Sequence, residues 1–228
     1  MIYDLTPFTL LDFPKKIAAI IWFGGCNMRC LYCYNPDIVF AKSGKLTEEN
    51  ILSFLKERRS LLDGIVYCGG EPTNYRGIFD LSKKIKELGF LVKLDTNGTS
   101  PETIKGLIES KLIDYVALDI KAPGKKYEDI TGYKDFQKIE NSLKILINSD
   151  IDFEVRTTIH SDLISERDLM EIIGFLEKNK FTKIYYIQNY IHTKTIGNIK
   201  KPEKNVDLQK LTENFIKNIS FKIEFRNF

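Results

Sequence analysis

The chain has 228 residues and a net charge of +3, and 43% of its residues are hydrophobic and 29% charged. This composition is typical of a globular chain that buries a core, and the charge is too small and too evenly spread to predict nucleic-acid binding. No secretory leader is evident, and the longest apolar run, 17–23, is far below the ~20 residues of a membrane helix, so we expect a cytoplasmic protein without a membrane span.

Short β-branched runs alternate with amphipathic runs along the whole chain. In chain order the pattern predicts a strand over 16–23, a helix over 46–62, a strand over 64–68, a helix over 77–89, a strand over 90–96, a helix over 101–110, a strand over 113–121, a helix over 135–149, a strand over 151–159, a helix over 165–179, a strand over 183–190, a helix over 206–219 and an edge strand over 221–227. Six strands that are each followed by a helix predict an α/β fold with a parallel sheet, either an open doubly wound sheet or a barrel. No linker-like segment interrupts the pattern, so we expect one domain over 1–228.

Local signals mark several helix ends. Thr47 and Ser165 each stand where an N-cap is needed, with a polar partner three residues on. Pro101 suits the first turn of a helix, and Gly89 suits the residue after the last turn.

Polar residues follow most of the predicted strands, and in parallel α/β folds the carboxyl ends of the strands meet on one face. The segments GGCNMRC, CGGEPT, DTNG, DIK, RTTIH and QNY all stand at such ends. We therefore expect one site on that face.

The most distinctive segment is GGCNMRCLYCYNPD at 24–37. Cys26, Cys30 and Cys33 are spaced C-x3-C-x2-C, and the glycines before them and the Asn-Pro after them predict a loop. Three unligated thiols so close together in a loop are not expected of cysteines that merely fill a core.

Two kinds of metal centre fit this trio. A structural zinc site needs four ligands, so Cys68 or a histidine would have to complete it. A [4Fe–4S] cluster with three thiolates keeps an open coordination position on one iron, where a substrate can bind.

C-x3-C-x2-C with Tyr32 before its last cysteine, after the first strand of a β/α repeat, resembles the radical S-adenosylmethionine superfamily. The resemblance implies a partial (β/α)6 barrel with Cys26, Cys30 and Cys33 as the cluster ligands and Tyr32 as a hydrophobic shield. In that family the open iron binds the amino and carboxylate groups of S-adenosylmethionine. One electron from the cluster then yields a 5′-deoxyadenosyl radical, which abstracts a hydrogen atom from the substrate.

Other strand ends extend the resemblance. Gly69, Gly70, Glu71 and Pro72 form the motif that receives the methionine ammonium in the family. Glycines permit close backbone approach, and the glutamate supplies negative charge. A plain Gly-Gly turn is the alternative for this segment, and we interpret Cys68 as a buried small residue, with a role as a mixed ligand left open.

The LDTNG and LDIK segments narrow the assignment. Asp119 and Lys121 share one side of a strand and resemble the D-x-K of activating enzymes for glycyl radical enzymes, in which this lysine meets the carboxylate of S-adenosylmethionine. Asp95, Thr96 and Asp119 match positions that bind a monovalent cation in the formate-lyase activase. An Asn-Gly turn is the alternative for the segment that contains Asn97.

Two further strand ends supply candidates for cofactor contact. Arg156 lies in a strand pattern where a charge is costly unless it meets an anion, and Thr158 and His160 share its face. Gln188 and Tyr190 end the next strand, where the family places contacts to adenine.

The segment TPFTLLDFPKKIA at 6–18 indicates which branch of the family to expect. Asp12 and Pro14 match the opening motif of glycyl-radical activases, and the LDFP form resembles anaerobic ribonucleoside-triphosphate reductase activating proteins. This implies that the chain generates a glycyl radical on that reductase, with a flavodoxin or ferredoxin-like electron donor. Asp12 would help to position the incoming glycine loop, and a plain turn is the alternative.

Two other functions remain open. One is a radical S-adenosylmethionine enzyme that acts on a small molecule, similar to 7-carboxy-7-deazaguanine synthase. The other is a zinc-binding or electron-transfer module without catalysis, which would leave the Gly-Gly-Glu and Asp-x-Lys segments unexplained.

Overall fold

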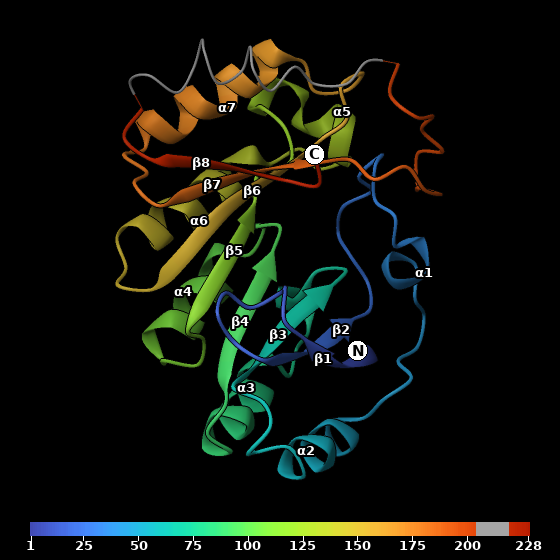
Figure 1. Cartoon of the computed structure of the whole chain (residues 1–228), viewed down its shortest axis with the longest axis vertical. Coiled ribbons are helices and arrows are strands. Elements are labelled where there is room, and N and C mark those ends of the chain that lie inside the picture. The colour runs from blue at the N-terminus through green and yellow to red at the C-terminus, as the bar shows by residue number, and fades with distance from the viewer. Residues whose placement is uncertain (204–218) are drawn as a thin grey trace.

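A computed structural model of the protein describes residues 1–203 and 219–228. Eight strands form one sheet and lie side by side in chain order (Figure 1). The first pair is antiparallel and every later pair is parallel. The strands are β1 (Ile2–Thr9), β2 (Ala18–Phe23), β3 (Gly64–Gly69), β4 (Leu91–Thr96), β5 (Tyr115–Asp119), β6 (Asp152–Ile159), β7 (Ile184–Asn189) and β8 (Lys222–Arg226).

Helices connect the parallel strands, and the longer ones lie along the outer side of the curved sheet (Figure 1). The helices are α1 (Pro36–Val39), α2 (Glu48–Lys56), α3 (Ile78–Glu87), α4 (Pro101–Glu109), α5 (Tyr127–Thr131), α6 (Phe136–Ile147) and α7 (Glu166–Lys178), with 3₁₀ turns η1 (Pro72–Asn74) and η2 (Gly124–Lys126). β1 and β8 form the two outer edges of the sheet, which does not close on itself in the described part of the chain. The predicted parallel α/β fold and its partial-barrel form are confirmed.

The predicted helix ends are explained by local chemistry. Thr47 and Ser165 each accept a hydrogen bond from the backbone three residues on and complete a capping box. Gly89 follows α3 with a φ of +91°, and Pro101 occupies the first turn of α4. Each of these helix ends is determined by residues that are close in the sequence, so the sequence alone was enough to predict it.

The structure differs from the sequence prediction at four helices and strands. β1 was not predicted, because Pro7 interrupts its pattern and an edge strand with an irregular register tolerates the missing N–H. α1 and α5 were not predicted because they span only four and five residues. α2 ends at Lys56, although the expected helix extended over 46–62. The expected helix over 206–219 falls almost entirely on 204–218, outside the described residues.

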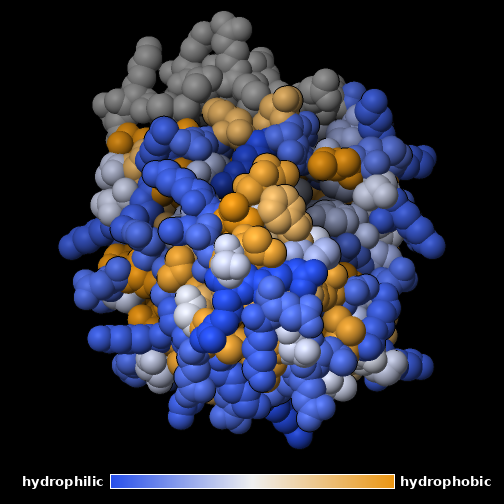
Figure 2. Space-filling view, turned by 60° about the horizontal axis from the view of Figure 1, so that its bottom comes forward, coloured by the Kyte–Doolittle hydropathy of each residue, from blue (hydrophilic) through white to orange (hydrophobic). Residues whose placement is uncertain are grey.

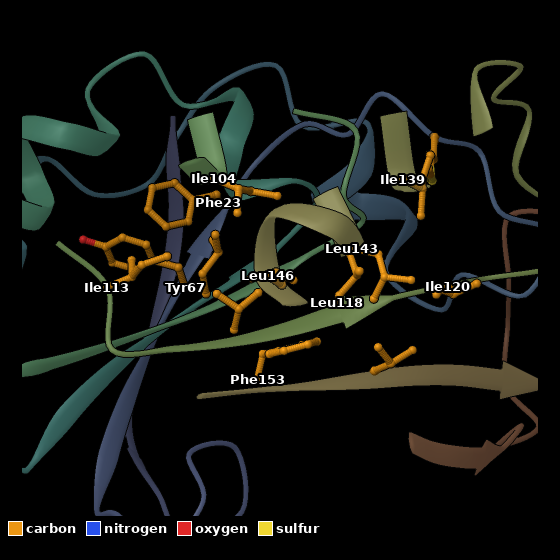
Figure 3. Packing of buried hydrophobic residues seen from close by; sticks show 14 of the residues in the cluster. Phe23, Tyr67, Ile104, Ile113, Leu118, Ile120, Ile139, Leu143, Leu146 and Phe153 are labelled. Carbon is orange, nitrogen blue, oxygen red and sulfur yellow. The ribbon is translucent and has the colours of Figure 1, made fainter. Parts of the chain in front are cut away.

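The core lies between the sheet and its covering helices. Figure 3 shows Leu143 and Leu146 of α6 over Leu118 of β5, with Phe153 on the neighbouring strand β6. These side chains are almost completely buried. Burying each of them contributes about 1.5–3 kcal/mol, so the apolar faces of the helices hold the strand ends in place.

The surface is mainly hydrophilic, with hydrophobic side chains gathered near the centre of the face in Figure 2. The large exposed hydrophobic residues include Phe8, Leu10 and Leu11, which belong to the end of β1 and the loop after it. Among the described residues, no helix is both long and apolar enough to cross a membrane.

Candidate active site

The three cysteines of the C-x3-C-x2-C motif lie in the loop between β2 and α1, as predicted, and not in a helix. All three line one pocket of about 120 Å³, which we call the cysteine pocket. Backbone bonds hold the loop: the Arg29 N–H donates to the Thr131 carbonyl over 2.7 Å, and the Leu31 N–H donates to the Ile130 carbonyl over 3.0 Å. The short helix α5 therefore anchors the cysteine loop.

The cysteine pocket contains most of the residues that the sequence singled out. Its lining includes Cys26, Cys30, Cys33, Tyr32, Gly69, Gly70, Glu71, Asp95, Thr96, Asn97, Asp119, Lys121 and Arg156. They come from the ends of β3, β4, β5 and β6 and from the cysteine loop. The structure thus brings the carboxyl ends of these four strands and the cysteine loop together around one pocket. Pro72 is buried at the start of η1 and lies outside this lining.

Burial favours the protonated form of two of the three thiols, those of Cys26 and Cys30, as long as no metal binds them. Burial raises the pKa of the Cys30 thiol to about 12, and the positive charge of Lys121 opposes this only in part. Burial also raises the pKa of Cys26. A bound iron would displace these protons, since thiolate is the form that binds metal.

The trio suits a cluster by its chemistry. A mononuclear zinc site surrounds one ion with all its ligands, whereas each iron of a cluster takes its own thiolate. In the described residues, no three Cys, His, Asp or Glu side chains are arranged to hold a single ion. Cys68 also lines the cysteine pocket, and burial raises the pKa of its thiol to about 12.

The Gly-Gly-Glu-Pro segment is joined directly to the cysteine loop. The Glu71 N–H donates to the Gly25 carbonyl over 2.9 Å, and the Gly70 N–H donates to the Phe23 carbonyl over 2.8 Å. A Cβ on Gly70 would lie 2.0 Å from the oxygen of Gly25, so only glycine allows this approach. The two loops thus form one continuous wall.

Glu71 is the acidic group of this wall, and only 2% of it is exposed. Its carboxylate accepts hydrogen bonds from the hydroxyls of Thr73 (2.6 Å) and Thr96 (2.7 Å) and from the Asn97 N–H (2.7 Å). Burial raises the pKa of Glu71, and these hydrogen bonds oppose the rise. A cation such as a substrate ammonium would favour the ionised form.

Asn97 connects the end of β4 to the cysteine loop. Its side-chain amide donates to the Asn27 Oδ1 over 3.0 Å, and the Asn27 amide donates to the Thr99 hydroxyl over 2.8 Å. The chain bends at Gly98, whose φ is +76°, directly after β4, and Asn97 does not have the positive φ that an Asn-Gly type I′ turn requires. The segment offered as a plain turn therefore lies on the wall of the cysteine pocket.

A buried ionic network forms the floor of the cysteine pocket. The Arg156 NH1 group donates to the Asp95 carboxylate over 2.9 Å, and its Nε donates to Asp119 over 2.8 Å. Lys121 donates to the other oxygen of Asp119 over 3.2 Å, and the Tyr32 hydroxyl donates to the Lys121 carbonyl over 3.3 Å. Arg156 thus pairs with two carboxylates on the sheet, as expected for a charged side chain in a strand.

The charges of this network fix its protonation. Burial alone would raise the pKa of Asp119, but the charges of Arg156 and Lys121 lower it to about 2. Burial would lower the pKa of Lys121, but Asp119 raises it well above its usual value. Both groups are therefore charged at neutral pH.

This network predicts acid-sensitive folding. The pKa of Asp119 is lower in the folded chain than its ordinary 3.8, so the carboxylate stabilises the fold above pH 4 and this stabilisation is lost as the pH falls toward 2. Urea unfolding of the iron-free protein should show a loss of stability between pH 4 and pH 2. Asp119→Asn should be less stable at pH 7 and should lose less over that range. An equal loss in both proteins would contradict this role.

Three other candidates lie away from the cysteine pocket. Gln188 and Asp12 line a second pocket, described below, and not the cysteine pocket. His160 is buried and bonds the Lys200 carbonyl over 2.8 Å, with its ring against Tyr190. His160 thus holds the segment after β7, and no contact joins it to the cysteine pocket.

The second pocket, of about 500 Å³, lies between the edges of the open sheet, and we call it the edge pocket. Leu11, Asp12 and Pro14 reach it from the loop after β1, and Arg226 and Asn227 reach it from the end of β8. The remaining lining residues are Lys93, Glu154, Arg156 and Gln188. Arg156 borders both pockets.

Sequence reasoning missed two buried charged residues that line the edge pocket, Lys93 and Glu154. Lys93 and Glu154 are 2% and 1% exposed, and each lies within a strand. Arg226 pairs with Glu154 at 3.3 Å, and the Tyr115 hydroxyl donates to Glu154 over 3.0 Å. A charged residue inside an apolar strand was the available signal: Lys93 pairs with Asp95 of its own strand, whereas the partners of Glu154 come from other strands.

Comparison with known proteins shows the family. The family model described as "Radical SAM superfamily" matches residues 20–176. MJ1227 of Methanocaldococcus jannaschii, named as a candidate glycyl-radical enzyme activating enzyme, is 33% identical over 96% of this chain and 94% of its own. The pyruvate formate-lyase-activating enzyme of Clostridium pasteurianum is 30% identical over 78% of this chain and 76% of its own.

Solved structures show the same fold. Streptococcus suis SuiB bound to its precursor peptide SuiA superposes with a TM-score of 0.70 at 20% identity, over 90% of this chain. The structure titled anSMEcpe with bound AdoMet superposes with a TM-score of 0.61 at 21% identity, over 74% of this chain. The chain spans about half the length of these two proteins, 48% and 50%. With these relatives, the chain belongs to the radical S-adenosylmethionine superfamily, as a glycyl-radical-enzyme activating oxidoreductase that uses a [4Fe–4S] cluster and S-adenosylmethionine.

Proposed function

We propose that the glycyl radical enzyme activated by this chain is an anaerobic ribonucleoside-triphosphate reductase. The observation that carries the proposal is the LDFP segment, whose Asp12 and Pro14 line the edge pocket. This pocket lies where the open sheet leaves a gap between β1 and β8, so a loop of another protein can reach it. The four cysteines of this sequence suffice for one cluster, so the electron comes from a separate flavodoxin or ferredoxin-like donor.

Cys26, Cys30 and Cys33 would hold the cluster, and the cysteine pocket would hold S-adenosylmethionine. When bound, this pair supplies the 5′-deoxyadenosyl radical that takes a hydrogen atom from a glycine Cα. Glu71 and the backbone of 69–72 would bind the ammonium group of S-adenosylmethionine. Lys121 and Arg156 would supply positive charge for its carboxylate. Tyr32, which is 6% exposed, excludes water on the side of the cluster.

The protein's contribution is therefore positioning. The reacting atoms must be held in contact, and a misplacement of about 1 Å costs roughly 100-fold in rate. Asp12 is held by the Thr9 hydroxyl at the mouth of the edge pocket, where it can accept backbone N–H groups from the incoming loop. No proton transfer by a side chain is required.

The test is anaerobic. The reconstituted chain is mixed with dithionite, S-adenosylmethionine and an anaerobic ribonucleotide reductase, and the glycyl radical doublet is sought by electron paramagnetic resonance. A doublet with this reductase and none with pyruvate formate-lyase supports the proposal, and the reverse result assigns the formate-lyase as partner. Formation of 5′-deoxyadenosine with neither doublet would favour a small-molecule substrate.

The edge pocket gives a separate prediction. Asp12→Ala should reduce glycyl radical formation by about tenfold or more, because the loop is held less closely. It should leave slow S-adenosylmethionine cleavage without partner unchanged, since Asp12 lies outside the cysteine pocket. Asp80→Ala, an exposed carboxylate on α3, is the matched control. Equal effects of Asp12→Ala on cleavage and on radical formation would contradict a role in docking.

A further inference from the structure

Lys93 is an unusual feature of the sheet interior. It lies in the middle of β4 between the buried residues Val92 and Leu94, and only 2% of its side chain is exposed. Lysine is almost never fully buried unless it is paired, because an isolated ammonium in a protein interior is very costly. Its partner is the carboxylate of Asp95, two residues along and on the same face of the strand.

The carboxylates of Asp95 and Asp119 are fully engaged by cationic groups of this chain. Asp95 Oδ1 accepts from Lys93, and its Oδ2 accepts from Arg156 NH1 over 2.9 Å. Asp119 Oδ1 accepts from Arg156 Nε over 2.8 Å, and its Oδ2 accepts from Lys121 over 3.2 Å. Every carboxylate oxygen of the pair thus faces an N–H donor.

The third expected ligand of a monovalent cation is engaged elsewhere. The Thr96 hydroxyl donates to Glu71 Oε1 over 2.7 Å and accepts from the Gly98 N–H over 3.1 Å. Asp95, Thr96 and Asp119 therefore do not offer a set of free oxygens. These oxygen atoms are better suited to the cationic side chains of this protein than to a metal ion from solution.

The charge balance leads to the same conclusion. Lys93, Lys121 and Arg156 carry three positive charges against the two negative charges of Asp95 and Asp119. Glu154 lies 4.0 Å from Arg156 and 3.3 Å from Arg226, and because Glu154 and Arg226 carry opposite charges they leave this balance unchanged. The surplus of one positive charge matches the carboxylate of S-adenosylmethionine. A further cation at this depth would add like-charge repulsion, which is strong where water is excluded.

We propose that the Lys93 ammonium acts as a built-in monovalent cation on Asp95, so that this chain binds S-adenosylmethionine without free Na⁺ or K⁺. An ammonium group carries the same charge as these ions and is likewise attracted to carboxylate oxygens, to which it donates N–H hydrogen bonds. Lys93 is in this sense a positioning residue: it holds Asp95, which holds Arg156 beside the cofactor carboxylate. The inference concerns the cofactor site only and does not depend on which enzyme is the partner.

Equilibrium dialysis of labelled S-adenosylmethionine against the reconstituted holoenzyme tests this directly. The dissociation constant is measured in KCl, in NaCl and in tetramethylammonium chloride at equal ionic strength, since the bulky cation cannot replace a small one. The natural chain should give the same constant in all three salts, within about twofold. Lys93→Met should bind about tenfold or more weakly in tetramethylammonium and should recover in KCl or NaCl.

Lys86→Met is the matched control, because Lys86 also pairs with an aspartate, Asp114, but lies outside both pockets. It should bind equally in all salts. If Lys93→Met does not fold, Lys93→Gln, which keeps a donor to Asp95 without the charge, replaces it. Weaker binding by the natural chain in tetramethylammonium would overturn the proposal. Unchanged binding by the Lys93 variant in every salt would also overturn it. Lys93 would then be assigned to contact with the partner's loop in the edge pocket, which it lines.

Discussion

Replacement of Cys30 by alanine is expected to abolish the iron–sulfur cluster and, with it, the cleavage of S-adenosylmethionine. Cys30 is the most buried of the three cysteines of the motif, with 6% exposed, and it lines the pocket together with the other two. Loss of a group that merely supports a metal ligand costs about 10–100-fold in affinity or activity, so loss of a ligand should exceed that range. Iron and sulfide analysis, the visible absorption of the cluster and 5′-deoxyadenosine formation measure the effect.

Cys68 provides the matched control, since its half-buried thiol lines the same pocket. Cys68→Ala should retain the iron and sulfide content of the natural chain, because three thiolates are enough for a cluster with an open position. Loss of iron in Cys68→Ala to the level of Cys30→Ala would show a fourth protein ligand. The conclusion that S-adenosylmethionine binds to a cluster iron without a protein ligand would then be wrong.

Substitution of Gly70 by alanine should have the second large effect. The added Cβ would lie 2.0 Å from the oxygen and 2.5 Å from the carbon of the Gly25 carbonyl, and both are backbone atoms that cannot rotate away. The Glu71–Gly25 hydrogen bond would have to lengthen, and the cysteine loop would separate from the Gly-Gly-Glu segment. We expect a loss of about 1–3 kcal/mol or more in unfolding free energy and roughly 100-fold weaker binding of S-adenosylmethionine.

Gly174→Ala separates this effect from glycine replacement in general. Gly174 lies within α7, and a Cβ there meets no atom within 4 Å. Alanine favours a helix over glycine by about 1 kcal/mol, so this variant should melt at the same or a higher temperature and should bind S-adenosylmethionine normally. Thermal melts and equilibrium dialysis distinguish the two glycines. Normal binding by Gly70→Ala would mean that the two loops do not form one wall.

The sequence predicted those parts of the fold that depend on local patterns. The alternation of apolar runs located the parallel strands, and Thr47, Ser165 and Gly89 located helix ends. β1 was missed because an edge strand gains its stability from one neighbour and tolerates Pro7, so its own residues carry little signal. The short helix α5 was missed because its stability comes from packing around Tyr127 and Ile130.

The candidate site was predicted to the extent that its residues follow strand ends. Cysteines, glycines and acids at those ends converge because parallel strands all end on one face. The interior ionic network was only partly predicted: Glu154 and Arg226 pair across strands that are distant in the sequence, and Lys93, although it pairs with Asp95 of its own strand, was not singled out. Gln188 was expected beside the cofactor but lines the edge pocket, because the end of β7 lies nearer to the edge of the open sheet.

The central claim is that three cysteines hold a [4Fe–4S] cluster whose remaining iron binds S-adenosylmethionine. Mössbauer spectra of the protein reconstituted with ⁵⁷Fe, recorded before and after addition of S-adenosylmethionine, test it most directly. The account predicts that about a quarter of the iron absorption, that of the one iron without a cysteine, shifts on addition. Spectra that do not change on addition, with all irons already fully coordinated by the protein, would contradict it.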